Sequence, residues 1–301
     1  MRKALLLLLS LIVLAAGLYS YQPARLATYY YLGRAQGCPL ENALHAPAEL
    51  KSQIDTKDKI LYASKKLQTD EKGFELWNTP NGQYWIPKGS HYVLPFNLAE
   101  QARNIYTHGD VTVKAGDVVL DCGANIGVYT RKALDAGAAK VIAIEPAPEN
   151  IECLRRNFKA EIEAGKVIVY PKGVWDKDEM LTLHVDPNNS AADSFLIERE
   201  GHKDEAKIPL TTIDKLVAEL QLSRVDFIKM DIEGAEVRAL QGGRATIARD
   251  HPRLALSTYH AAGHPVDVPK AVLAAWDGYR SECGVCAELR FGLRPDIMFF
   301  H

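Results

Sequence analysis

This sequence has few cysteines and no excess of positive charge. Its 301 residues include 5 cysteines, and 36 lysines and arginines are balanced by 38 aspartates and glutamates, which leaves a net charge of -2. No basic run alternates with aromatic residues, so we expect no nucleic-acid partner. Cys283 and Cys286 form a lone C-x-x-C pair, and the other cysteines are too scattered to complete a zinc site. We expect this pair to be reduced thiols in a cytosolic protein and a disulfide outside the cytosol.

A third glycine is missing from the loop that would otherwise mark a dinucleotide site. Val118 to Asp121 is an apolar run that ends on a carboxylate, which is typical of a strand buried in a parallel sheet. Gly123 and Gly127 follow, with Asn125 between them, and helical apolar spacing begins at Ile126. A strand, a glycine turn and a helix in this order predict the first unit of a doubly wound nucleotide-binding fold.

The missing glycine also bears on the cofactor. In the dinucleotide motif that glycine allows close approach to a pyrophosphate, which S-adenosylmethionine lacks. A second apolar run, Val141 to Glu145, ends on an acid 24 residues beyond Asp121, about where a ribose-binding carboxylate belongs. These features favour S-adenosylmethionine over NAD. The lack of a Tyr-x-x-x-Lys pair in the expected place also disfavours an NAD-dependent oxidoreductase.

A second acidic stretch follows the strand predicted to end at Asp231. Glu233 and Glu236 lie on the turn and the first helical turn after it. Helix capping explains Glu236, whereas an acid at the carboxyl end of a central strand faces the crevice of an open α/β sheet. We take Asp231, Glu233 and His260 as candidates for removing a hydroxyl proton, with Asp231 and His260 ranked equally. The same three side chains suit Mg²⁺, but no further Asp and Asn ligands accompany them, and we predict no metal.

Four motifs resemble those of the FkbM-type family of S-adenosylmethionine-dependent methyltransferases. They are Val119–Gly127, Ile144–Pro146, Pro209–Asp214 and Ile228–Glu236, and the resemblance covers roughly residues 110–258. It implies a class I methyltransferase fold, which is a Rossmann-like α/β fold with a seven-stranded sheet and helices on both faces. It also implies O-methylation of a sugar, a glycan or another small hydroxyl-bearing acceptor. The alternative is a binding or scaffold protein that keeps the fold without transfer.

The resemblance further implies roles for individual residues. Glu145 would hold the ribose, and Asp231 would face the sulfonium and the acceptor. The residues around the methionine end of the cofactor would be Asp121, Gly123, Asn125 and Gly127. The residues beside the adenine would be Gly173 and Val174.

The region before the core motifs is predicted to be a connector and a small α+β extension over residues 22–109. Alternation from Phe74 to Ile86 around Asn81-Gly82 predicts a hairpin. Asn97 with Glu100 resembles a capping box that opens a short helix. These elements would form a lid beside the sheet or simply cover its edge.

One long uncharged segment precedes the extension. Ala4 to Tyr19 follows Met1-Arg2-Lys3 and approaches the roughly 20 residues that cross a bilayer. Ala15-Ala16-Gly17 resembles a signal-peptidase site, but we favour a retained single-pass membrane anchor over residues 1–21, before the extension and a methyltransferase domain at 110–301. Flanking charges weakly favour an outside location for that domain. A cytosolic methyl-donor cofactor favours the cytoplasmic side, where we place it.

Overall fold

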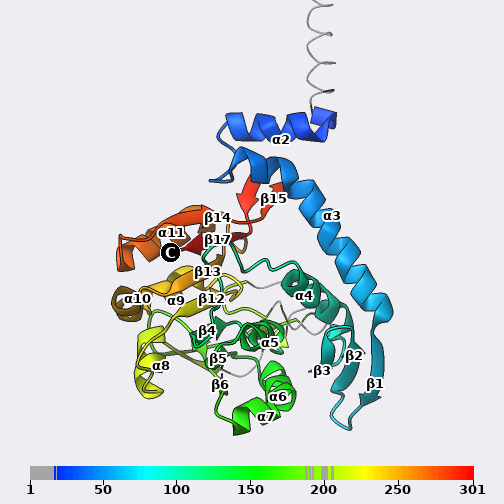
Figure 1. The fold of residues 1–301 in the computed structure, drawn as a ribbon, viewed down its shortest axis with the longest axis vertical. Coiled ribbons are helices and arrows are strands. Elements are labelled where there is room, and N and C mark those ends of the chain that lie inside the picture. The colour runs from blue at the N-terminus through cyan, green and yellow to red at the C-terminus, as the bar shows by residue number, and fades with distance from the viewer. Residues whose placement is uncertain are drawn as a thin grey trace, which may run out of the picture.

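A seven-stranded sheet forms the centre of the molecule (Figure 1). The computed structural model describes residues 17, 19–186, 189, 191, 193–197, 203–204 and 207–301. From one edge to the other, the strands of the sheet are β14 (Ser281–Cys283), β17 (Ile297–Phe300), β13 (Arg253–Ser257), β12 (Phe227–Met230), β4 (Val118–Cys122), β5 (Lys140–Ile144) and β6 (Val167–Tyr170). All pairs from β13 to β6 are parallel, and β17 runs antiparallel to both its neighbours. The predicted seven-stranded α/β fold is confirmed.

Helices cover both faces because neighbouring residues of the central strands are both apolar. Leu120 and Ile228 pack on the side of α8 (Ile213–Glu219), α9 (Glu236–Gln241), α10 (Arg244–Asp250) and α11 (His264–Ala275). Val119 and Phe227 point to the opposite side, which α5 (Val128–Asp135), α6 (Pro148–Asn157) and the short α7 (Lys159–Glu163) cover. This double burial fixes the register of the parallel strands and brings their carboxyl ends to one edge of the sheet.

The N-terminal extension lies along one flank of this core (Figure 1). It comprises α2 (Gln22–Tyr31), the 24-residue α3 (Leu40–Ala63), an antiparallel sheet of β1 (Lys65–Thr69), β2 (Glu75–Thr79) and β3 (Gly82–Ile86), and α4 (Val93–Ala102). Buried residues of β3 and α4 share an apolar cluster with Ile126 and Cys153 of the core. The extension is therefore packed against the edge where β4 and its glycine loop end.

Two sequence-based expectations for the extension have different outcomes. The hairpin is confirmed, but its loop is Pro80-Asn81 and not Asn81-Gly82, because Gly82 already pairs with Thr79. The capping box at Asn97 is wrong, because α4 begins at Val93, directly after a 3₁₀ turn at Ser90–Tyr92. Apolar packing of the first helical turn, including Leu94, outweighs the capping signal further along.

Small β elements surround the sheet. Next to its β6 edge, β7 (Gly173–Val174), β11 (Ile208–Thr211) and β8 (Glu179–Leu181) form a three-stranded sheet in that order. The described residues also form two antiparallel strand pairs, namely β9 (His184–Val185) with β10 (Lys203–Asp204) and β15 (Cys286–Leu289) with β16 (Gly292–Pro295).

The prediction of a single-pass membrane anchor needs correction. Among the described residues, no helix is both long and apolar enough to cross a membrane. The helix that follows the predicted anchor, α2, has only 10 residues, including arginine, glutamine and threonine. Residues 1–16, which make up most of the predicted anchor, lie outside the described part of the chain. The membrane localisation, with its cytoplasmic placement of the domain, therefore has no support.

A disulfide joins the extension to the end of the chain. Cys38, just before α3, is bonded to Cys286, 248 residues later, with a Cα–Cα distance of 6.2 Å. The bond lies in an apolar cluster with Leu26 and Leu293. Cys283 keeps a free thiol whose Sγ is 3.6 Å from that of Cys286. Both expectations for the C-x-x-C pair are wrong: the two cysteines are neither both reduced nor bonded to each other, because the packing of α2 and α3 brings Cys38 to Cys286.

Removing this disulfide should lower the free energy of unfolding. Opening so long a loop restores conformational entropy to the unfolded chain. We therefore expect the free energy of unfolding of Cys38→Ser, measured in urea without reductant, to be about 2–5 kcal/mol lower than that of wild type. With reductant, the two proteins should unfold at the same urea concentration. Equal stability without reductant, or a peptide map without a Cys38–Cys286 cross-link, would contradict the pairing.

Candidate functional site

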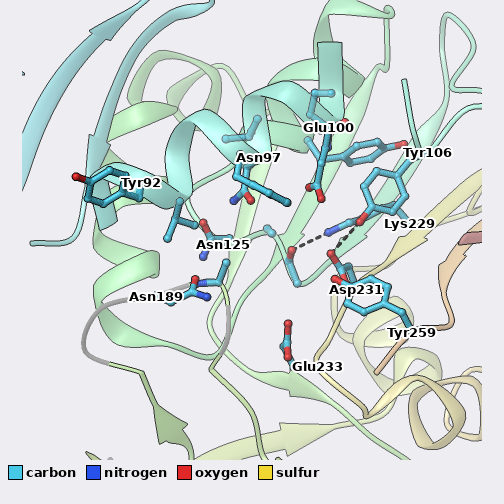
Figure 2. A pocket seen from close by; sticks show the side chains of 18 residues that line it. Tyr92, Asn97, Glu100, Tyr106, Asn125, Asn189, Lys229, Asp231, Glu233 and Tyr259 are labelled. Carbon is cyan, nitrogen blue, oxygen red and sulfur yellow. Dashed lines mark hydrogen bonds between the residues drawn. The ribbon is translucent and has the colours of Figure 1, made fainter. Parts of the chain in front are cut away.

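Two adjoining cavities open at the carboxyl ends of β4, β5 and β12. The larger has a volume of about 470 Å³ and lies beneath α4 (Figure 2). The smaller, of about 60 Å³, lies between the ends of β4 and β5 and the strand β7. Gly123, Asn125, Asp231 and Glu233 line both. An open α/β sheet binds its ligands at this edge, so these shared residues mark the candidate site.

The loops after β4 and β12 pack against each other in strained conformations. Gly123 has φ +78, and a Cβ there would lie 1.9 Å from the carbonyl oxygen of Asp231, so only glycine fits. Asn125 and Glu233 adopt left-handed backbone conformations with φ of 49 and 50 although neither is glycine. Such residues persist only where the surroundings hold them, and they cluster at functional sites.

Glu145 anchors the glycine loop from the neighbouring strand. Its buried carboxylate accepts hydrogen bonds from the backbone N–H groups of Asn125, at 2.8 Å, and Ala147, at 2.9 Å. Burial raises the pKa of this carboxyl, and the two backbone bonds act against that rise. Glu145 lines the small cavity together with Gly173 and Val174. The three residues predicted to contact ribose and adenine therefore lie together.

A buried ion pair supports the same loop from below. The ammonium of Lys229, on β12, lies 3.3 Å from Oδ1 of Asp121 and donates a hydrogen bond of 2.8 Å to the carbonyl of Gly123. Thr130 donates to the other oxygen of Asp121 at 2.7 Å. Burial raises the pKa of Asp121. Burial alone would lower the pKa of Lys229, but the charges of Asp121 and Asp231 raise it.

Asp231 presents its carboxylate to the large cavity with both oxygens engaged (Figure 2). Oδ2 accepts a hydrogen bond from the hydroxyl of Tyr106 at 2.8 Å, and Oδ1 accepts one from Tyr259 at 3.1 Å. Burial alone would raise the pKa of Asp231, but the positive charges of Lys229 and His260 lower it. Asp231 is therefore a fixed negative charge and a weak base.

His260 lies behind this carboxylate, with a side chain only 2% exposed. Nδ1 is 2.7 Å from Glu236 Oε1, and Nε2 is 3.3 Å from Glu233 Oε1 and 3.4 Å from Asp231 Oδ1. Burial would lower the pKa of His260, but these carboxylates raise it to about 10. A histidine that already carries its proton cannot take another. Its role as a base stays a prediction, and the geometry favours an imidazolium that neutralises the carboxylates around it.

Three of the predicted site residues line neither of the two cavities. Asp121 and His260 lie beneath the loops and hold them in place. Gly127 is the N-cap of α5 and has φ +95. A Cβ there would lie 2.1 Å from the ring of Phe158, so this glycine allows α5 to pack closely. The other predicted residues border at least one of the cavities: Gly123, Asn125, Glu145, Gly173, Val174, Asp231 and Glu233.

Most residues that line the large cavity are missing from the site predicted from sequence, and Lys229, Glu100, Tyr106 and Tyr259 are among them. Lys229 carries a signal, since a charge inside the buried strand Phe227–Met230 needs a buried partner. Glu100, Tyr106 and Tyr259 carry none, because they reach the cavity from distant parts of the chain.

Replacing Lys229 should destabilise the fold, because the buried carboxylate of Asp121 then has no positive partner. Lys229→Met leaves Asp121 buried and uncompensated, and we expect a loss of about 3–5 kcal/mol in urea unfolding. The double variant Lys229→Met with Asp121→Asn should lose less, because no charge is then left unpaired. The control is Lys51→Met, which replaces an exposed lysine by the same residue. Equal losses in the single and double variants would show that the ion pair is not the cause.

The His260 imidazolium should make stability depend on pH. Its folded pKa lies above the unfolded value of about 6.5, so its stabilisation is complete below pH 6.5 and is lost as pH rises toward 10. Between pH 7 and 9, the unfolding free energy of wild type should fall more steeply than that of His260→Gln, by up to about 1.4 kcal/mol per pH unit. The exposed His45→Gln should keep the wild-type slope. Parallel slopes for wild type and His260→Gln would refute the charged state.

Known proteins resemble this chain over the region that carries the site. A model of the methyltransferase FkbM domain matches residues 121–273. The chain is 26% identical over 164 residues to the 31-O-demethyl-FK506 methyltransferase FkbM of Streptomyces tacrolimicus, which covers 46% of this chain and 63% of the relative. It is 28% identical over 159 residues to the hexuronic acid methyltransferase AglP of Haloferax volcanii, which covers 53% and 62%. The chain thus spans less than two thirds of the length of either relative.

Solved structures add a comparison of shape. The methyltransferase FkbM from Methylobacillus flagellatus KT superposes with a TM-score of 0.47 and 17% sequence identity, over 86% of this chain and 62% of that one.

Proposed function

Since the chain belongs to the FkbM methyltransferase family, we propose that it is an S-adenosylmethionine-dependent O-methyltransferase for a small hydroxyl-bearing acceptor such as a sugar. The observation that carries the proposal is the junction of the two cavities. The small one has the buried carboxylate that a nucleoside needs, and the large one is polar and opens directly beside it. A donor and an acceptor bound in them would meet at Gly123, Asn125, Asp231 and Glu233.

The residues of the small cavity fit the cofactor. A carboxylate has about four lone-pair positions, and Glu145 already accepts hydrogen bonds from the N–H groups of Asn125 and Ala147 and from the amide of Asn150. One position is left for a ribose hydroxyl. Gly173 and Val174 offer an apolar wall for adenine, and the negative charge of Asp231 suits a sulfonium. Asp193 and Phe195 also line this cavity, and they must move outward to admit a nucleoside into so small a space. When bound, the cofactor supplies an electrophilic methyl group.

The large cavity suits an acceptor with several hydroxyl groups. Asn97, Glu100 and Gln101 of α4 contribute polar side chains, and two aromatic rings of the same segment stand at the surface, Tyr92 at 64% exposed and Phe96 at 39%. Polar groups that converge beside exposed rings match a sugar, which has hydroxyl edges and an apolar face. Holding the acceptor oxygen against the methyl group could contribute about 7–11 kcal/mol to catalysis through proximity.

Calorimetry on the full chain should detect S-adenosylmethionine binding and no NAD binding. Glu145→Ala should weaken the affinity for the methyl donor at least about tenfold, because hydrogen bonds to a charged group contribute about 1.5–3 kcal/mol. Glu145→Gln should show an intermediate loss, since the amide keeps one acceptor oxygen. The control is Glu149→Ala, an exposed acid on the adjoining α6, which should bind like wild type.

A second measurement follows release of S-adenosylhomocysteine with a panel of methyl glycosides and hexuronic acids. Turnover with at least one of them is the expected result. Donor binding without turnover on any hydroxyl acceptor would favour the scaffold alternative, and preference for NAD would overturn the proposal.

A further inference from the structure

Glu100 brings a second carboxylate into the large cavity, opposite Asp231. It lies on α4, which roofs the cavity, and its carboxylate points toward the interior, where Lys229 and Asp231 also lie (Figure 2). Unlike Asp231, it accepts no hydrogen bond from the tyrosines of the cavity. An acceptor hydroxyl in the cavity therefore meets two carboxylates, of which only Asp231 is hydrogen-bonded to tyrosines.

The extension fixes the orientation of Glu100. Arg103 donates a hydrogen bond of 2.6 Å to Oε1 of Gln53, and Nε2 of Gln53 donates one of 3.3 Å to Oε1 of Glu100. An arginine can only donate, so the Gln53 amide must turn its oxygen to Arg103 and its NH₂ to Glu100. Glu49 pairs with Arg103 and holds it on the other side. Within the described part of the chain, the second oxygen of Glu100 makes no hydrogen bond and is left for a ligand.

The electrostatic surroundings separate Glu100 from Asp231 and His260, two of the three candidate bases predicted from sequence. Burial, followed by the nearby charge of Asp231, raises the pKa of Glu100 to about 8. Asp231 has a lowered pKa, and His260 already carries a proton at neutral pH. General bases work best when their pKa lies near the working pH. Among Glu100, Asp231 and His260, it is Glu100 that has the proton affinity that the task needs.

We propose that Glu100 is the general base that removes the proton of the acceptor hydroxyl, and that Gln53 and Arg103 are its positioning residues. The inference rests on the proposed function. The acceptor O–H bond breaks as its proton passes to the free oxygen of Glu100. The acceptor oxygen uses an electron pair to form a bond to the methyl carbon, and the donor sulfur leaves with the pair of the broken S–C bond. Glu100 then releases the proton to solvent.

Titration of the carboxyl group tests the assignment without any acceptor. The full chain is labelled with ¹³C at the glutamate carboxyl carbon and followed by NMR from pH 5 to 10. One resonance should titrate near pH 8 in wild type and in Glu71→Gln, an exposed control, and should be absent from Glu100→Gln. If every glutamate titrates below about pH 6, Glu100 is not the base.

Kinetics with an acceptor that wild type methylates provide the second test. Glu100→Gln should lower kcat by about 10²–10⁴-fold, while its affinity for S-adenosylhomocysteine, measured by calorimetry, stays within about twofold of wild type. Wild-type kcat should rise with pH through about 8, because only the deprotonated carboxylate accepts a proton. Gln53→Leu should raise the pKa of that profile, because the Gln53 hydrogen bond lowers the pKa of Glu100.

The outcomes separate this inference from the proposed function. Full turnover by Glu100→Gln with normal cofactor binding would overturn the assignment of Glu100 and leave the methyltransferase intact. A wild-type chain that binds neither S-adenosylmethionine nor S-adenosylhomocysteine would overturn the proposed function itself. If no acceptor in the panel is methylated, the carboxyl titration still decides whether Glu100 has the proton affinity of a base.

Discussion

The contact between the loops after β4 and β12 is the constraint on which the site depends. The backbone N–H of Asp231 donates to the carbonyl of Cys122 at 3.0 Å, and Lys229 donates to the carbonyl of Gly123. Because Gly123 has no side chain, the second loop can lie directly on the first. Both cavities take their shared wall from this contact.

Charge is distributed around this contact so that Asp231 and Glu100 differ in proton affinity. Two buried cations lie beside it: Lys229 contacts Asp121 at the end of β4, and His260 contacts Asp231 and Glu233 of the loop after β12. They keep Asp231 ionised, and Tyr106 and Tyr259 donate hydrogen bonds to its two oxygens. Glu100 lies outside this network on a separate element, and burial raises its proton affinity. Two carboxylates that face the same space can therefore have different functions, one as a fixed charge and the other as a proton acceptor.

The sequence predicts those parts of the site that follow one another along the chain. A buried strand, a glycine turn and an acid at the next strand end are local patterns, and they identify Gly123, Asn125 and Glu145 correctly as neighbours. The acceptor side is different, because Glu100 and Tyr106 come from the extension and Tyr259 from the end of β13. Their convergence depends on the packing of α3 and α4 against the core, which no local pattern encodes. The capping signal at Asn97 misled for the same reason, since tertiary packing decides where α4 begins.

The disulfide pairing likewise depends on distant packing. Cys283 and Cys286 are close in sequence, yet Cys286 bonds to Cys38 because α2 and α3 lie across the β15–β16 hairpin. This cross-link makes residues 38–286 a single covalent ring that contains both cavities and every residue of the proposed chemistry. A protease that cuts the ring once opens it without separating the pieces. The nicked protein stays one covalent molecule until the cystine is reduced, so one surface cut does not release either half of the site.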